Sequence, residues 1–347
     1  MSVDDLFQRY LDAGFLYRDK LQRLEPFRDE IMDNWRRAAA SPDNLLRVVT
    51  FAGNRQRSWA SLATWRHTET AWCVQHLVSR GDPIASRAVM MAEFDATLED
   101  ACHLSNQSWF RPDNRLPQRV FGSIIARLGN DLARSNLLTV FEVPRRAAAP
   151  CSRVSVQELS ADNQHELAAL ATEARGVVYA AGEGFGAPDF GLSALDAAYR
   201  KVGLFRYRRA WIAYAGQRPV AALVAHRGPL GLNYSFIENR ADLLVSSVCP
   251  QATLLEATAA LVSAASPHYA DFRPGHLPLF VDEQSAPILS STGLRPIRSY
   301  CQTLWLRAGY AEYRAHLEAT FAKVVARADR QKRLRERLVK TQPVEIP

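Results

Sequence analysis

The amino-acid sequence predicts an α+β fold made of two similar domains in tandem, followed by one long helix. The main observation is that landmarks of the first half return in the same order in the second half, at a nearly constant spacing. These landmarks are Phe51 and Ile212, Leu62 and Leu223, the tripeptides at 110–112 and 272–274, Gly129 and Gly293, and Val140 and Leu304. Self-similarity over so long a period indicates repeated structural units.

The most specific landmark is Phe110-Arg111-Pro112, which returns unchanged as Phe272-Arg273-Pro274. We expect the two copies at equivalent places in the two units. With 347 residues the chain has room for two domains. The predicted parts are an N-terminal domain at 1–143, a proline-bounded linker at 144–152, a C-terminal domain at 153–309, and a C-terminal amphipathic helix with a basic tail at 310–347.

The composition is that of a globular protein, with 48% hydrophobic and 23% charged residues. The acidic start of the chain lacks the basic and apolar segments of an export signal, and no stretch is long and apolar enough to span a membrane. Five scattered cysteines without a Cys-x-x-Cys pair indicate reduced thiols and no zinc site. We therefore expect a cytoplasmic protein without bound metal, and the oligomeric state stays open.

The net charge of +7 is concentrated at the C-terminal end. Residues 310–347 hold nine of the 43 Lys and Arg residues and five of the 36 Asp and Glu residues, which leaves +3 for the rest of the chain. A nucleic-acid-binding face needs basic residues gathered on the folded surface. The charge pattern therefore carries no strong nucleic-acid signal, and the partner of the basic tail stays open.

The first domain reads as helices, three strands, a helix, a strand, a helix and a strand. Hydrophobic residues three or four apart predict the opening helices between Phe7 and Trp35. The later elements are strands at 48–52, 59–65 and 70–78, a helix at 85–98, a strand ending at 110, a helix at 117–128 and a strand at 137–143. The short connections between the first three strands favour antiparallel pairing.

The second domain repeats this order with one additional strand at its start. The predicted elements are a strand at 154–159, helices at 161–174 and 192–202, strands at 210–214, 220–226 and 232–237, a strand ending at 248, a helix at 250–265, a strand near 271–272, a helix at 283–291 and a strand at 299–306. The segment Gly182–Ala187 matches Gly-x-Gly-x-x-Gly/Ala, but no helix directly follows it, so we expect a substrate-side loop. In the last helix, the stripe from Tyr310 through Leu317 to Ala328 should pack on the second domain.

This order of elements resembles the GNAT superfamily of acyl-CoA-dependent N-acyltransferases. The run from Val281 to Pro296 is similar to that family's penultimate helix, and 299–306 is similar to the strand after it. Two such units in one chain resemble the tandem arrangement of Fem-type aminoacyltransferases and protein myristoyltransferases. The resemblance implies a splayed sheet, an acyl-CoA co-substrate, and a small-molecule or peptide amine as the acceptor.

The resemblance also implies where acyl-CoA binds, namely at a diverging strand and the start of the next helix. The matching residues are Val245, Ser246, Ser247, Gln251, Ala252 and Thr253. The family's phosphate loop reads Gln/Arg-x-x-Gly-x-Gly/Ala, but Leu254 and Glu256 replace its small residues here, and Asp82 lies in the matching loop of the first domain. Both phosphate loops are therefore degenerate.

Two residues are candidates for proton transfer. Glu238 matches the place where the superfamily often keeps a carboxylate that deprotonates the amine, and the alternative is a turn residue paired with Arg240. Tyr300 is a candidate donor of a proton to the leaving thiolate, and the alternative is a packing role. Arg111, Asn114 and Arg273 are candidate substrate-binding residues, because a guanidinium can hold a carboxylate or phosphate through two bonds. The alternative for both arginines is a structural role.

Two functions follow from this pattern. The first is an acyltransferase of GNAT type that moves an acyl group from acyl-CoA to an amine, with its reaction in the second domain. The second is a non-catalytic binding or regulatory protein that has kept the fold, since a fold does not entail an activity. The full-length second domain favours the enzyme, whereas the degenerate loops favour the binding protein.

Overall fold

A computed structural model describes the chain except residues 1, 53–57, 82, 146–152 and 341–347, and gives only the backbone at 83 and 332–340. Most of the predicted linker at 144–152 lies outside the described residues, as do Asp82 and the end of the basic tail. Among the described residues, no helix combines the length and the apolar character that crossing a bilayer requires.

The first half begins with helices and continues as three strands, a helix, a strand, short helices and a strand. Its elements are α1 (Val3–Asp12), α2 (Arg18–Leu24), η1 (Glu25–Phe27), α3 (Arg28–Ala39), β1 (Leu46–Ala52), β2 (Trp59–Arg66), β3 (Ala71–Arg80), α4 (Pro83–Leu98), β4 (Ser105–Phe110), α5 (Arg115–Pro117), η2 (Gln118–Gly122), α6 (Ile124–Leu128) and β5 (Ala133–Pro144). This order confirms the elements predicted for the first domain.

The second half follows the same order after one additional strand. Its elements are β6 (Ser155–Glu158), α7 (Gln164–Arg175), α8 (Val177–Gly182), α9 (Ser193–Arg200), β7 (Tyr207–Ala215), β8 (Arg218–Arg227), η3 (Ile237–Asn239), β9 (Ala241–Val245), α10 (Gln251–Ala265), η4 (Ser266–Tyr269), β10 (His276–Asp282), α11 (Ala286–Ser290), β11 (Pro296–Leu306), η5 (Arg307–Gly309) and α12 (Tyr310–Lys340). The α+β class with two repeated units is therefore confirmed.

The two units exchange their last strands. Among the described residues, eleven strands form one sheet in the order β1-β2-β3-β4-β11-β5-β10-β9-β8-β7-β6. Strand β11 of the second unit pairs with β4 of the first, and β5 of the first unit pairs with β10 of the second. At the centre β5 and β11 run antiparallel, and Leu137 lies opposite Cys301. These two residues are 164 apart, the spacing of Gly129 and Gly293, as expected at an approximate two-fold axis.

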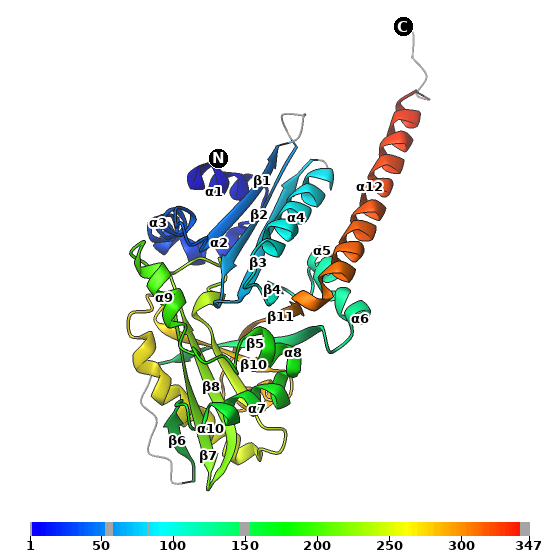
Figure 1. The fold of residues 1–347 in the computed structure, drawn as a ribbon. Coiled ribbons are helices and arrows are strands. Elements are labelled where there is room, and N and C mark those ends of the chain that lie inside the picture. The colour runs from blue at the N-terminus through cyan, green and yellow to red at the C-terminus, as the bar shows by residue number, and fades with distance from the viewer. Residues whose placement is uncertain (1, 53–57, 82, 146–152, 341–347) are drawn as a thin grey trace.

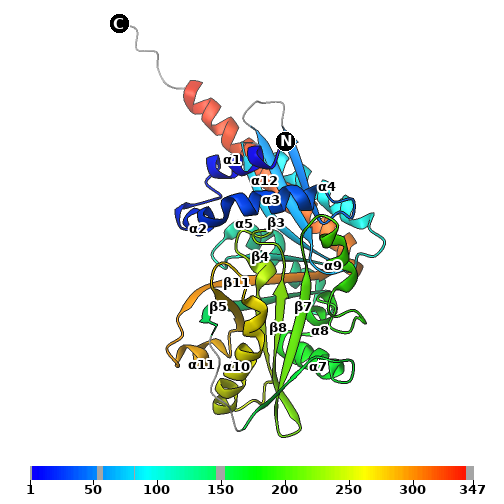
Figure 2. The ribbon, with the colours of Figure 1, turned by 90° about the vertical axis from the view of Figure 1, so that its left-hand side faces the viewer.

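Helices cover both faces of the first unit's strands, as Figures 1 and 2 show. Helices α1–α3 lie on one face of β1–β3, and α4 lies on the other together with α12. Strands β2 and β8 are accordingly buried along almost their whole length, and their sequences are nearly continuous runs of apolar and small residues. Because both faces of these two strands are buried, polar and apolar residues do not alternate along them.

The long helix α12 packs on the first unit, so the prediction that it packs on the second was wrong. The buried side chains of its first half, Tyr313, Leu317 and Phe321, share a core with Val89 and Phe94 of α4. The reason is the strand exchange, because β11 carries the chain into the first unit before the helix begins. Farther along, α12 extends away from the body of the molecule (Figure 1).

Two predicted strands of the second unit, at 232–237 and near 271–272, are absent; the second segment lies in the turn before β10. Residues 232–237 belong to a loop between β8 and β9 in which Gly231 and Phe236 have φ values of 79° and 59°. A side chain at Gly231 would collide with Ile31, and the Gly231 carbonyl accepts a bond of 2.7 Å from Trp35. The loop therefore packs closely against α3, which a strand in the sheet could not do.

The repeated tripeptide does not occupy equivalent places, so this part of the duplication argument was wrong. Phe110 is the last residue of β4, whereas Phe272 lies in a turn before β10 begins at His276. Gly129 and Gly293 do correspond, because each follows the short helix before an exchanged strand and has a positive φ. The order of elements, rather than the tripeptide, establishes the repeat.

Candidate functional site

The first unit has a cleft where two parallel strands separate. Strands β3 and β4 pair only from Ala71 opposite Ser105 to Val74 opposite Ser108. Beyond this point a cavity of about 320 Å³ opens, lined by Gln75 and other residues of both strands. We name it the first cleft.

The first cleft is lined from both faces of the sheet. Phe15, Tyr17 and Lys20 come from the α1–α2 segment, whereas Pro117 and Phe121 come from the segment that precedes α6. These two segments cover opposite faces of the strands (Figures 1 and 2). Two ligands can therefore approach one another through the gap between the strands, each from its own face.

A bulge in β3 places His76 in the wall of the first cleft. The register with β2 shifts between Ser61 and Ala63, and His76 has a φ of 54°. Its ring stacks on Tyr234 with centroids 4.3 Å apart, and Nε2 accepts a bond of 3.4 Å from the Tyr234 N–H. Burial, and then Lys20, hold the pKa of His76 well below its usual value. The ring is therefore neutral, and its Nδ1 has no partner among the described residues.

Lys20 is a half-buried cation in the same cleft. Its ammonium lies 4.1 Å from the centre of the Phe15 ring, and no carboxylate among the described residues forms an ion pair with it. Burial, and then Arg298 and Arg23, lower the pKa of Lys20 to about 7. The cleft thus holds a positive charge without a matching negative one.

Three residues predicted from the sequence meet at the first cleft. Arg111 and Asn114 lie exposed at its rim, where Arg111 is 3.5 Å from the Tyr17 hydroxyl and 3.5 Å from Asp113. Tyr300, on the exchanged strand β11, is buried in its wall. The sequence assigned Tyr300 to the second unit, but the strand exchange delivers it to the first.

The second unit has a corresponding cleft with a different set of charged residues. Strands β9 and β10 pair only at Ala241 and Asp242, and a cavity of about 400 Å³ lies beyond, lined by the predicted Val245, Ser246 and Ser247. Three carboxylates, those of Glu173, Asp282 and Glu283, also line this second cleft, together with two arginines, Arg134 and Arg175.

In the second cleft Glu173 occupies the polar groups that the sequence assigned to a ligand. Its carboxylate accepts bonds from the Ser247 N–H at 2.7 Å and from the Ser246 hydroxyl at 3.1 Å. The other predicted cofactor residues, Gln251, Ala252 and Thr253, form the first turn of α10 and do not line the cavity. Phosphates would meet several carboxylates in this cleft.

Glu238 supports the loop beside the first cleft and does not line it. Its fully buried carboxylate accepts bonds from the N–H groups of Gly231 at 2.6 Å and Asn233 at 3.2 Å. Burial raises its pKa to about 7 against these backbone groups, which lower it. The alternative of a turn residue fits this geometry, but the expected pair with Arg240 does not form, because Arg240 binds other carboxylates.

Arg273 lies apart from both clefts. It is exposed and forms an ion pair of 2.7 Å with Glu30 of α3. It precedes β10, whereas the sequence placed it directly after a strand. This geometry fits a structural role for Arg273 rather than substrate binding.

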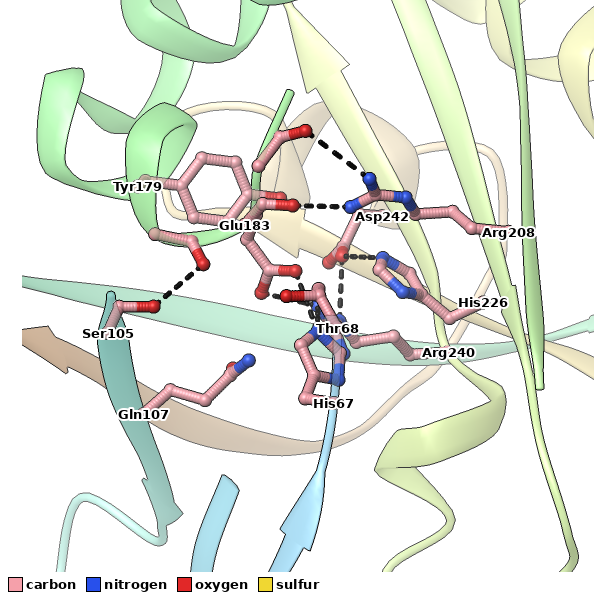
Figure 3. Close-up of polar contacts among 12 residues, drawn as sticks. His67, Thr68, Ser105, Gln107, Tyr179, Glu183, Arg208, His226, Arg240 and Asp242 are labelled. Atoms are coloured by element: carbon pink, nitrogen blue, oxygen red, sulfur yellow. Dashed lines mark hydrogen bonds and ion pairs between the residues drawn. The ribbon is translucent and has the colours of Figure 1, made fainter. Parts of the chain in front are cut away.

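A buried polar network lies between the two units, and Figure 3 shows its side chains pointing toward one another. Glu183 is its centre, because it contacts His67 Nε2 at 2.7 Å, Arg240 Nη2 at 2.7 Å and Gln302 Nε2 at 3.1 Å. Asp242 binds Arg175 and Arg240 at 2.8 and 2.7 Å. Burial alone would raise the pKa of Glu183, but Arg240 and His67 hold it well below its usual value.

The network includes three side chains whose ligand atoms lie within 4.8 Å of one another, namely His67, Glu183 and His226. Such a group can hold a metal ion, but here Arg240 lies 3.4 Å from His67 and 2.7 Å from Glu183. The guanidinium already supplies the positive charge, so the network reads as a structural link between the units. Glu183 is also fully buried, which contradicts the predicted substrate-side loop at 182–187.

The order of strands and the two splayed clefts define a tandem protein with a GNAT-like fold. The second half has every element that the resemblance implied, in the implied order. The first half lacks only the initial strand among its described residues.

No protein-family model and no curated protein matches the chain. Solved structures do resemble it. They include a tandem GNAT protein from the clavulanic acid biosynthesis pathway (10% identity, 79% of this chain and 87% of that chain covered, TM-score 0.37). Others are GCN5-related N-acetyltransferases from Kribbella flavida (14%, 75% and 89%, 0.38) and Sphaerobacter thermophilus (12%, 72% and 76%, 0.35). At these scores the similarities carry no argument about the reaction.

Proposed function

We propose that the protein is an N-acyltransferase of GNAT type and that acyl transfer takes place in the first cleft. The observation that carries the proposal is the cavity of about 320 Å³ that is lined from both faces of the sheet. An acyl-CoA and an amine can enter it from opposite sides and meet between the strands. Holding two reactants in line supplies a large part of the rate enhancement of such a reaction.

The chemistry needs few side chains. The amine nitrogen attacks the thioester carbonyl, the C–N bond forms, the C–S bond breaks, and the sulfur takes up a proton. We assign to Tyr300 the transfer of its hydroxyl proton to the departing sulfur, followed by uptake of the proton that the nitrogen releases. The buried ring of His76, which stacks on Tyr234, forms part of the wall that holds the thioester in place.

A second candidate function is a non-catalytic binding protein. The observation in its favour is the second cleft, where Glu173 occupies the donors that a cofactor would use. The second unit has thus kept the splayed strands, but the hydrogen-bond donors at their edge are already bound to Glu173. Under this alternative the first cleft binds a ligand without reaction.

Calorimetry with acetyl-CoA and longer acyl-CoAs tests the proposal. Asn114→Trp fills the rim of the first cleft, and Ser135→Trp is the matched change at the second, since both residues are exposed and line their cavities. We expect binding to the wild type and to Ser135→Trp, and its loss in Asn114→Trp. Loss only in Ser135→Trp would move the site to the second cleft, and no binding of any acyl-CoA would favour the binding protein.

A further inference from the structure

Three cationic side chains gather around Tyr300. A small cavity of about 20 Å³ adjoins the first cleft, where Lys20 lies, and its charged lining residues are Arg23, Arg298 and Glu142. The two cavities share Ser235 and Tyr300 as a common wall. Lys20 and Arg23 come from α2 and Arg298 from β11, so elements from both halves of the chain build this cationic pocket.

The cations of this pocket are not balanced. Arg23 lies 3.6 Å from Glu142, and the same carboxylate lies 3.5 Å from His276. Lys20 and Arg298 form no ion pair among the described residues, and Arg298 instead donates a bond of 3.4 Å to the Tyr300 hydroxyl. Half-buried cations that repel one another are costly unless an anion joins them.

We propose that the cationic pocket binds an anionic group of the acceptor, so that the substrate is an amine that also carries a carboxylate or a phosphate. The planar guanidinium of Arg298 can hold either group through two hydrogen bonds, and Lys20 adds a compact charge beside it. The amine part of this assignment rests on the proposed function, whereas the anion part does not.

The position of the pocket assigns the anion to the acceptor rather than to acyl-CoA. Lys20 reaches the first cleft from α2, on the face opposite Phe121 and α4. The resemblance places the acyl-CoA phosphates at the start of the helix that follows the splayed strand, which is α4 in this unit. A cavity of about 20 Å³ has room for about one water-sized group, so one oxygen of the anion can enter it while the rest of the anion lies in the first cleft, and a nucleotide does not fit.

Binding measurements without any acyl-CoA test the proposal separately from the acyltransferase assignment. Two matched pairs serve as probes: L-phenylalanine against L-phenylalaninamide, and O-phosphoethanolamine against ethanolamine. We expect the anionic member of at least one pair to bind about tenfold or more tightly than its neutral partner, as hydrogen bonds to charged groups allow. Preference in the first pair assigns a carboxylate, and preference in the second a phosphate.

Variants of the cationic residues show which side chains cause the preference for the anionic probe. Lys20→Met and Arg298→Gln should each abolish the preference, whereas Lys20→Arg should keep it. Arg18→Gln and Arg295→Gln are matched controls on the same two segments, because both residues are exposed and outside the two cavities. Acyl-CoA affinity should stay unchanged in all of these variants, and a thermal melt of each shows that it is folded.

Three results would overturn the proposal. The first is the same affinity for both members of each pair, or no binding of any probe. The second is a preference that survives in both Lys20→Met and Arg298→Gln. A loss of acyl-CoA binding in Lys20→Met would instead assign the cations to the donor, and would also reject the proposal.

Discussion

The two clefts have the same scaffold but differ in the charged residues that line them. In each unit a strand pairs in parallel with its neighbour for a few residues and then diverges, which leaves a cavity beyond the last pair. The charged residues that line the first cleft are Lys20 and Arg111, whereas carboxylates outnumber arginines in the second, which is lined by Glu173, Asp282, Glu283, Arg134 and Arg175. The comparison teaches that the repeated backbone sets where a ligand can lie, and the side chains decide which ligand it can be.

Disrupting the buried polar network between the two units should have the largest effect on folding stability. Glu183→Ala leaves Arg240 buried and without one of its two carboxylate partners, and breaking a buried ion pair costs about 3–5 kcal/mol. Denaturant unfolding should show this loss in one transition, because the exchanged strands join both clefts in one sheet. Glu158→Gln, in an exposed pair with Arg209, is the control and should cost at most about 1 kcal/mol. Two separate transitions would show that the clefts belong to independent bodies.

A change at Tyr300, in the wall of the first cleft, should show that only this cleft carries out the reaction. Tyr300→Phe removes the proposed proton transfer and should lower the acyl-transfer rate about 100-fold, with an unchanged melting temperature. Ser246→Ala makes a comparably small change in the second cleft and should leave the rate unaltered. An equal rate in wild type and Tyr300→Phe would remove Tyr300 from the reaction.

The pH dependence of anion binding tests whether the Lys20 ammonium supplies positive charge in the first cleft. The pKa of Lys20 is lowered to about 7, with Arg23, Arg298 and the neutral His76 facing it, and Tyr234 beside it. Below pH 7 the ammonium is charged and anion affinity should be highest. Above pH 7 binding must take up a proton, so calorimetry should show affinity falling by up to about tenfold per pH unit.

Lys20 should affect the pH dependence of folding stability in the opposite direction, so that stability rises where anion affinity falls. Because its folded pKa lies below that of the unfolded chain, the unfolded state binds more protons between about pH 7 and 10, and the contribution of Lys20 to stability rises with pH there. Lys20→Met should remove both trends. If both persist in this variant, another group is responsible for them.

The smallest effect is expected at the chain end. Deleting residues 331–347 keeps Leu317 and Phe321, which pack against α4 beside the first cleft. The melting temperature should therefore barely change, whereas Leu317→Ala should cost about 2–5 kcal/mol through the cavity it leaves. A large loss of stability from the deletion would show that the charged end contributes to the fold.

Local patterns predicted the elements because helix and strand periods are properties of short segments. The helix at 250–265 and the strand at 299–306 are examples that the structure confirms within a few residues. The segment 232–237 was mistaken for a strand, because Tyr234 and its apolar neighbours pack across the unit boundary instead of in the sheet.

The site was harder to predict because it depends on contacts between distant segments. Arg111 and Asn114 were found from their position near a strand end. Lys20 was missed, since nothing in its helix shows that Arg298 will lie nearby. The charged residues inside apolar strands, such as Asp242 and His226, were an available signal for the buried network.

The strand exchange also imposes an order of events during synthesis. When residues 1–144 have left the ribosome, β4 has an open edge, because its partner β11 has not yet been made. At about 5–20 residues per second, that edge waits roughly 8–32 seconds until β11 is complete. An open strand edge is a template for association with other chains. Nascent chains of this protein are therefore expected to need a holding chaperone in this interval, and a gene fragment for the first half alone should give aggregates.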